Sequence, residues 1–243
     1  MGITQLIDPF YEKLPPEEFR QGPIMGQLCW IPSPQLNVIP QIFEIQRADP
    51  KEHHIGQFKI RNVQETDFRR RDELPLYKLK LRLHEELIIQ KAKRRPAIVL
   101  ITSNTIFQDI GDSLKSQGKR HLQEDSILVL PIYNIEKPDH PGGFPPIMTA
   151  RIKALKYNQF YYCPRTPGKE LIEGVARLDR LQIVFPVHRA SYIPLPIKLT
   201  GDAFLVLMEM IRAWLCIKGT PENEKYLSEL KELLEETLPS SDG

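Results

Sequence analysis

Short apolar runs with polar ends dominate the hydrophobic pattern of this chain. The run Ala97–Ile101 is rich in β-branched residues and too short for a typical helix, so it predicts a buried strand. Pro96 fits the first position of that strand, where its missing N–H is tolerated. Arg94 and Arg95 then lie where the strand reaches the surface. Positive charge held on a rigid element is suited to binding an anion, although solvated charges flanking a strand are the commoner case.

Similar patterns predict strands along most of the chain. They fall at Gly26–Ile31, Gln41–Gln46, Gln57–Val63, Leu76–Leu83, Ile127–Tyr133, Ile147–Leu155, Gln159–Cys163, Glu173–Leu178 and Leu181–Val187. Proline-bearing residues 1–25 predict a surface arm, and polar Gln108–Asp125 predicts a loop. The sequence therefore indicates a chain that is mainly β.

Two helices are predicted near the C-terminus. Ala203–Ile217 is strongly apolar, with Asp202 as its N-cap and Gly219 past its end. Glu224–Glu236 is amphipathic, and its leucines share one face: Leu227, Leu230, Leu233 and Leu234. Together with the strands, these helices predict the α+β class.

Bulk composition fits a protein with a sizeable core. The chain has 243 residues, 41% of them hydrophobic, and a mean hydropathy of -0.33. It shows no signal-peptide pattern and no apolar run of the roughly 20 residues a membrane helix needs. Cys29, Cys163 and Cys216 lack metal-ligand spacing, so reduced core cysteines in a cytoplasmic protein are expected.

The net charge of the chain is only +2, but positive and negative residues are concentrated in different segments. Lys59–Arg95 holds 12 Lys and Arg against 6 Asp and Glu, an excess of +6. Pro221–Gly243 holds 2 Lys against 7 Asp and Glu, an excess of -5. A solvated face commonly explains either segment, but a basic face is also what phosphate binding requires.

Four motifs resemble, in the same order, those of the PemK/MazF (Kid-like) family of toxin–antitoxin growth inhibitors. They are Gly26-Gln27-Leu28-Cys29-Trp30, Arg95-Pro96-Ala97-Ile98-Val99-Leu100, Val129-Leu130-Pro131-Ile132 and Gly174-Val175-Ala176-Arg177-Leu178-Asp179. Each motif is weak alone, and their order gives the match its specificity.

The resemblance implies an SH3-like β-barrel over residues 1–220, followed by an acidic helix and tail over 221–243. Residues 33–93 would form a long insertion after the first strand. It also implies a cytoplasmic, metal-independent endoribonuclease that cleaves single-stranded RNA without a cofactor. The implied partners are RNA, an antitoxin protein and a second copy of the chain, with no membrane.

The resemblance assigns catalysis to Asp179, Arg177 and Arg95. Arg94, at the surface end of the same strand, and Tyr133 are expected to bind RNA. Residues two apart on a strand share a face, so Arg177 and Asp179 are expected side by side. Asp179 would take the 2′-hydroxyl proton, and the arginines would stabilise phosphate charge. Tyr133 stands where many family members carry Thr or Ser.

Two further alternatives stay open. The chain is either this ribonuclease or a non-catalytic PemK-like module that binds nucleic acid or protein. The acidic C-terminal helix either occupies the RNA groove in place of an antitoxin or simply packs on the body, which is the commoner role. His121, His140 and His188 show no ligand grouping, so no metal site is expected.

Overall fold

The computed structural model describes residues 2–20, 22–35, 39–47, 51, 56–69, 79, 81–102, 126–135, 143–168, 171–186, 191–236 and 238. The chain divides into two compact units. We call Met1–Pro32 with Arg94–Gly243 the body, and Ser33–Lys93 the inserted unit.

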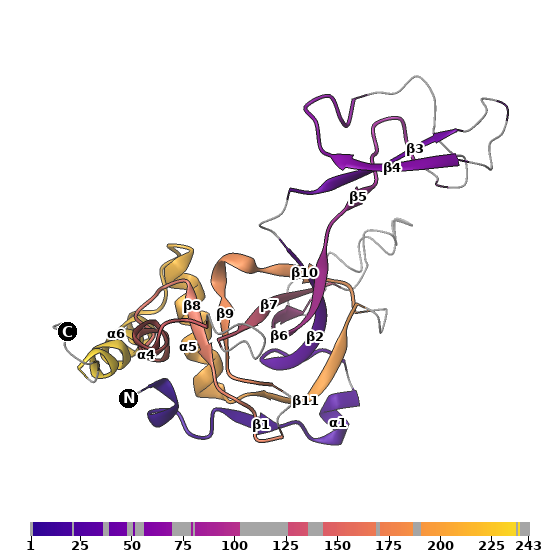
Figure 1. Cartoon of the computed structure of the whole chain (residues 1–243). Helices are drawn as coiled ribbons and strands as arrows, with labels where there is room; N and C mark the ends of the chain where they lie inside the picture. The colour runs from indigo at the N-terminus through magenta and orange to yellow at the C-terminus, as the bar shows by residue number, and fades with distance from the viewer. Residues whose placement is uncertain are drawn as a thin grey trace. The chain divides into compact units, whose positions relative to one another are not determined.

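The body is built on one curled antiparallel sheet with the strand order β1-β11-β2-β6-β7-β9-β8, and β10 also pairs with β7 (Figure 1). Its strands are β1 (Tyr11–Lys13), β2 (Gln27–Pro34), β6 (Ala92–Thr102), β7 (Ile127–Asn134), β8 (Phe160–Cys163), β9 (Gly174–Arg177), β10 (Gln182–Val184) and β11 (Ile193–Leu199). The predicted strands 26–31 and 97–101 therefore lie in the same sheet, as β2 and β6.

Helices of the body complete an α+β fold that is mainly β, as predicted. They are η1 (Ile3–Gln5), α1 (Pro16–Arg20), α4 (Pro146–Lys153), η4 (Leu178–Arg180), α5 (Gly201–Trp214) and α6 (Pro221–Glu235). The three longest, α4, α5 and α6, gather on one side of the sheet (Figure 1). The inserted unit contains a separate small sheet, β4 (Gly56–Asn62), β3 (Gln41–Arg47) and β5 (Ile88–Ile89), in that order.

Strand β6 is buried on both faces, which explains its unbroken apolar run. Ile98 and Leu100 pack into the larger core, together with residues from α4, α5 and α6. Ala97 and Val99 alternate to the other face and join a smaller core. A strand with both faces covered reads as a continuous hydrophobic segment rather than as an alternating one.

The C-terminal helix α6 uses its apolar stripe for packing. Leu227, Leu230 and Leu234 are buried in the larger core, whereas Leu233 is 54% exposed and does not belong to the buried face. Thr220 caps the helix by accepting a hydrogen bond from the Asn223 N–H. Burial of three leucines favours the packing role over the inhibitory one.

Several element predictions are wrong. Most of the segment Ile147–Leu155 lies in helix α4 rather than in a strand, and Pro146 takes the first position of that helix, where proline is favoured. Residues 1–25 are not only a surface arm, because Phe10 and Tyr11 are buried and β1 pairs with β11. Pro96 lies inside β6, which begins at Ala92.

Other boundaries shift or fall outside the described residues. Helix α5 begins after Thr200, and Asp202 lies in its first turn rather than capping it. Residues 81–83 are not a strand, while 76–78 and 80 lie outside the described residues, as does the whole loop predicted over 108–125. Cys29 and Cys163 are buried as expected, but Cys216 is exposed.

Candidate functional site

Three of the predicted site residues meet across adjacent strands of the body. Strand β7 lies between β6 and β9, and Tyr133 on β7 pairs with Val175 on β9. Ala97 pairs with Pro131, so extending this register places Arg95 across from Tyr133 on the other side. Arg177, two residues beyond Val175, shares its face.

The side chains make this meeting direct. The Arg95 Cζ atom lies 4.3 Å from the centre of the Tyr133 ring, and the Arg177 Cζ atom lies 5.8 Å from it. Both guanidinium groups are therefore within cation–π range of one ring. We call Arg95, Tyr133, Arg177 and Asp179 the arginine–tyrosine cluster.

Arg177 and Asp179 form a two-pronged ion pair. The Arg177 Nε atom donates to Asp179 Oδ1 at 3.0 Å, and Nη2 donates to Oδ2 at 2.6 Å. Arg180 approaches the same carboxylate, with Nε 3.3 Å from Oδ2. The two side chains of the main pair are 34% and 30% exposed, so solvent and solutes can reach them.

The route by which this pair forms differs from the prediction. Only Arg177 lies on β9, and Asp179 belongs to the 3-10 turn η4 that follows. Alternation along a strand therefore does not bring the two together. Because the chain turns directly after Arg177, the carboxylate returns to within hydrogen-bond reach of the guanidinium.

The ion pair changes the pKa of both partners in the directions expected for opposite charges in contact. Hydrogen bonds from Arg177 lower the pKa of Asp179, and the charges of Arg177 and Arg180 add to this against the opposing effect of burial. The hydrogen bonds to Asp179 likewise raise the pKa of Arg177. Asp179 is thus an ionised hydrogen-bond acceptor and a weak base in this arrangement.

Gly174 allows β9 to approach β7 closely beside the cluster. A Cβ atom at this position would lie 2.6 Å from Ile132 Cγ2 and 2.9 Å from the Tyr133 carbonyl oxygen. Contacts this short require the strands to separate. The absence of a side chain at Gly174 therefore helps to hold Tyr133 and Arg177 at their observed spacing.

The alternation of side chains along β6 directs Arg94 away from the cluster. It precedes Arg95 on β6, so its side chain leaves the opposite face of the strand, and it is exposed. Arg95 and Tyr133 are half-buried. The structure thus brings Arg95, Tyr133, Arg177 and Asp179 together and places Arg94 outside the cluster.

A neighbouring polar network was not predicted from the sequence. The Tyr162 hydroxyl donates to Glu173 Oε1 at 2.5 Å, and Lys153 Nζ lies 2.6 Å from the same oxygen. Burial opposes ionisation of Glu173, but these two partners outweigh it and lower the pKa of the carboxyl. Lys153 lies on α4, the segment predicted as a strand, so nothing in the sequence indicated its contact with Glu173.

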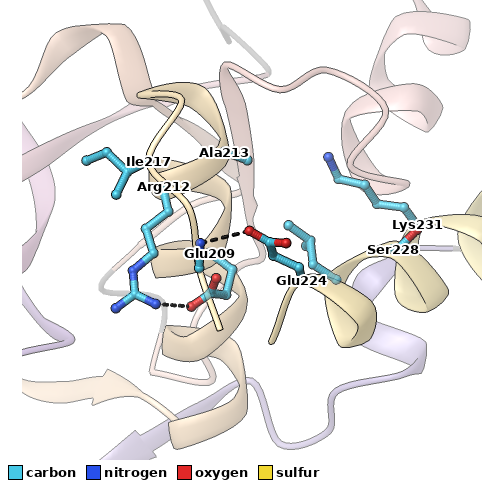
Figure 2. A pocket seen from close by; sticks show the side chains of 9 residues that line it. Glu209, Arg212, Ala213, Ile217, Glu224, Ser228 and Lys231 are labelled. Carbon is cyan, nitrogen blue, oxygen red and sulfur yellow. Dashed lines mark hydrogen bonds and ion pairs between the residues drawn. The ribbon is translucent and has the colours of Figure 1, made fainter. Parts of the chain in front are cut away.

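A cavity of about 290 Å³ lies between α5 and α6 (Figure 2). Its two carboxylates, Glu209 and Glu224, accept hydrogen bonds from neighbouring groups. Glu209 accepts hydrogen bonds from Arg212 Nη1 at 2.7 Å and Asn223 Nδ2 at 3.0 Å, and Glu224 accepts from the Gly219 N–H at 2.8 Å. This network ties the two helices together.

No metal-binding cluster of three or more His, Cys, Asp or Glu side chains occurs within the described residues. His121, His140 and His188 lie outside them. Within the same part of the chain, every helix is too short or too polar to span a bilayer. Comparisons with protein-family models, curated proteins and solved structures give no match to this chain.

Proposed function

We propose that the chain is a metal-independent endoribonuclease that binds single-stranded RNA at the arginine–tyrosine cluster, on an SH3-like barrel of the PemK/MazF type. The observation that carries the proposal is the convergence of two arginines on Tyr133 and of Arg177 on Asp179. These residues come from three strands and one turn. A surface cluster of fixed positive charge beside a carboxylate suits phosphodiester chemistry.

Each residue has a defined task in this proposal. Arg95 and Arg177 hold the scissile phosphate and stabilise the charge that builds on its oxygens. Asp179 removes the proton from the ribose 2′-hydroxyl. The 2′-oxygen forms a bond to phosphorus while the bond to the 5′-oxygen breaks, leaving a 2′,3′-cyclic phosphate and a 5′-hydroxyl. DNA lacks the nucleophile and is not cleaved.

Substrate binding resolves the apparent conflict with the low basicity of Asp179. A guanidinium fork binds a carboxylate and a phosphate with the same two-pronged geometry. An entering phosphate therefore competes with Asp179 for Arg177. Once Arg177 turns to the phosphate, the carboxylate loses the hydrogen bonds that lower its pKa and becomes a stronger base.

A non-catalytic module that binds RNA is the second candidate. The observation that favours it is the two-pronged Arg177–Asp179 pair with Arg180 beside it, because three short contacts to cations leave the carboxylate poorly suited to accept a proton. In that case Asp179 would only orient Arg177, and the cluster would bind phosphate without reaction.

Incubation of the purified protein with a mixed-sequence RNA in EDTA separates the two candidates. The ribonuclease proposal expects cleavage by the wild-type protein and a loss of about 10²–10⁴ in rate for Asp179→Asn. Asp202→Asn, an exposed aspartate on α5, is the matched control and should cleave normally. RNA binding without cleavage supports the module, and cleavage that requires a divalent metal contradicts the mechanism.

A further inference from the structure

Proton donation to the leaving group is a task that the three charged members of the cluster cannot perform well. Breaking the bond to the 5′-oxygen leaves an alkoxide unless a proton arrives. Arginine is too basic to supply one. Asp179 is ionised and accepts hydrogen bonds. The Tyr133 hydroxyl is the remaining group of the cluster with a transferable proton.

The position of Tyr133 suits its hydroxyl to this task better than its ring. Side chains stand roughly perpendicular to a sheet, so the phenol oxygen is the part of Tyr133 farthest from β7. Two guanidinium groups, one from each neighbouring strand, already lie over the ring. The ring is therefore already in contact with two cations, and the hydroxyl extends from the one side chain that both phosphate-binding arginines approach.

The two arginines also bring the phosphate to this side chain. The Arg95 Cζ atom lies 4.3 Å from the centre of the Tyr133 ring and the Arg177 Cζ atom 5.8 Å from it. A phosphate held by both guanidinium groups would therefore be held beside the Tyr133 side chain, where its hydroxyl is the proton source nearest to hand in the cluster.

We propose that Tyr133 is the general acid, which transfers its hydroxyl proton to the departing 5′-oxygen. This assignment rests on the proposed ribonuclease function and adds a catalytic residue to it. Asp179 gains the proton of the 2′-hydroxyl as the 2′-oxygen bonds to phosphorus, and the 5′-oxygen takes the Tyr133 proton as its bond to phosphorus breaks. Exchange with water then returns the proton from Asp179 to Tyr133, so the cycle needs no other reactant.

Two RNA substrates test the assignment with one variant. One is an ordinary oligoribonucleotide, and the other carries sulfur in place of the leaving 5′-oxygen at the cleavage site. A thiolate leaves without protonation, so it does not need a general acid. Tyr133→Phe keeps the ring beneath both arginines and removes only the hydroxyl. Tyr226→Phe, on α6, is the matched control.

We expect Tyr133→Phe to slow cleavage of the ordinary RNA by about 10²–10⁴ and to cleave the sulfur substrate at nearly the wild-type rate. The ratio of the two rates within one preparation does not depend on the folded fraction. An equal loss on both substrates, or no loss on either, overturns the role of Tyr133. If the wild-type protein cleaves neither substrate, the ribonuclease function fails and this role fails with it.

Discussion

Replacing Arg95 and Arg177 together with glutamine should weaken RNA binding in a salt-dependent way. The Cζ atoms of Arg95 and Arg177 lie 4.3 Å and 5.8 Å from the centre of one tyrosine ring, so one RNA backbone can engage both guanidinium groups. Binding releases the counterions condensed on each neutralised phosphate. Loss of two such contacts should therefore reduce both affinity and its dependence on salt.

The size of the effect follows from the number of contacts. For single strands, the slope of log affinity against log salt changes by about 0.7 per phosphate contact, so two contacts account for about 1.4. Between 50 and 200 mM salt, the wild-type affinity should then fall about 7-fold more than that of the variant. The cation–π contacts contribute about 0.5–1 kcal/mol each and the Arg177–Asp179 pair about 0.2–1, so the variant should remain folded.

Fluorescence anisotropy with a labelled 2′-O-methyl RNA measures this without cleavage. Arg20→Gln with Lys225→Gln is the matched control, because it removes the same net charge from exposed positions on α1 and α6. The control should lose little of the salt slope, and urea unfolding should show that both variants are folded. An unchanged slope in the Arg95 and Arg177 variant, or an equal change in the control, would refute phosphate binding at the cluster.

Three other predictions test the structure around the site. Leu234→Ala should lower the free energy of unfolding by about 2–5 kcal/mol because Leu234 is fully buried, whereas Leu233→Ala should change it by less than about 0.5 in the same urea titration. A thiol reagent should modify the exposed Cys216 rapidly and the two buried cysteines only on unfolding, where burial no longer raises their pKa. Because the folded pKa of Asp179 is lowered, its contribution to stability is present above about pH 4 and lost below it. The stability difference between wild type and Asp179→Asn should therefore shrink only in acid.

Sequence reasoning succeeded where burial leaves a local pattern. The apolar runs that form β6 and β7 have both faces covered along much of their length, so they stand out without any knowledge of their partners. The leucine stripe of α6 was recognised for the same reason, apart from Leu233. Local periodicity is enough to predict an element when the apolar pattern of its own residues shows which positions are buried.

Elements defined by distant partners were missed or misread. Strand β11 contains Pro194 and Pro196, which interrupt its pattern, and its register with β2 shifts between Pro194 and Lys198. Strand β1 is three residues long and exists through pairing with β11 at the other end of the chain. The proline start of α4 was a usable local signal, but its mixed apolar spacing was taken for a strand.

The site was only partly predictable for a related reason. The identities of Arg95, Tyr133, Arg177 and Asp179 came from motifs, whereas their contacts depend on the register of three strands that are far apart in the sequence. The stacking of two arginines on Tyr133 could not be derived before that register was known. The Arg177–Asp179 contact was expected, but it is formed by a turn that no strand pattern predicts.

Cleavage of RNA through the ribose 2′-hydroxyl can be tested directly with two substrates. The substrate is an oligoribonucleotide of a sequence the protein cuts, paired with a copy that has a single 2′-deoxy nucleotide at the cut position, both in EDTA. We expect a 2′,3′-cyclic phosphate and a 5′-hydroxyl from the first substrate, and an intact bond at that position in the second. Cleavage at the 2′-deoxy position would contradict this expectation.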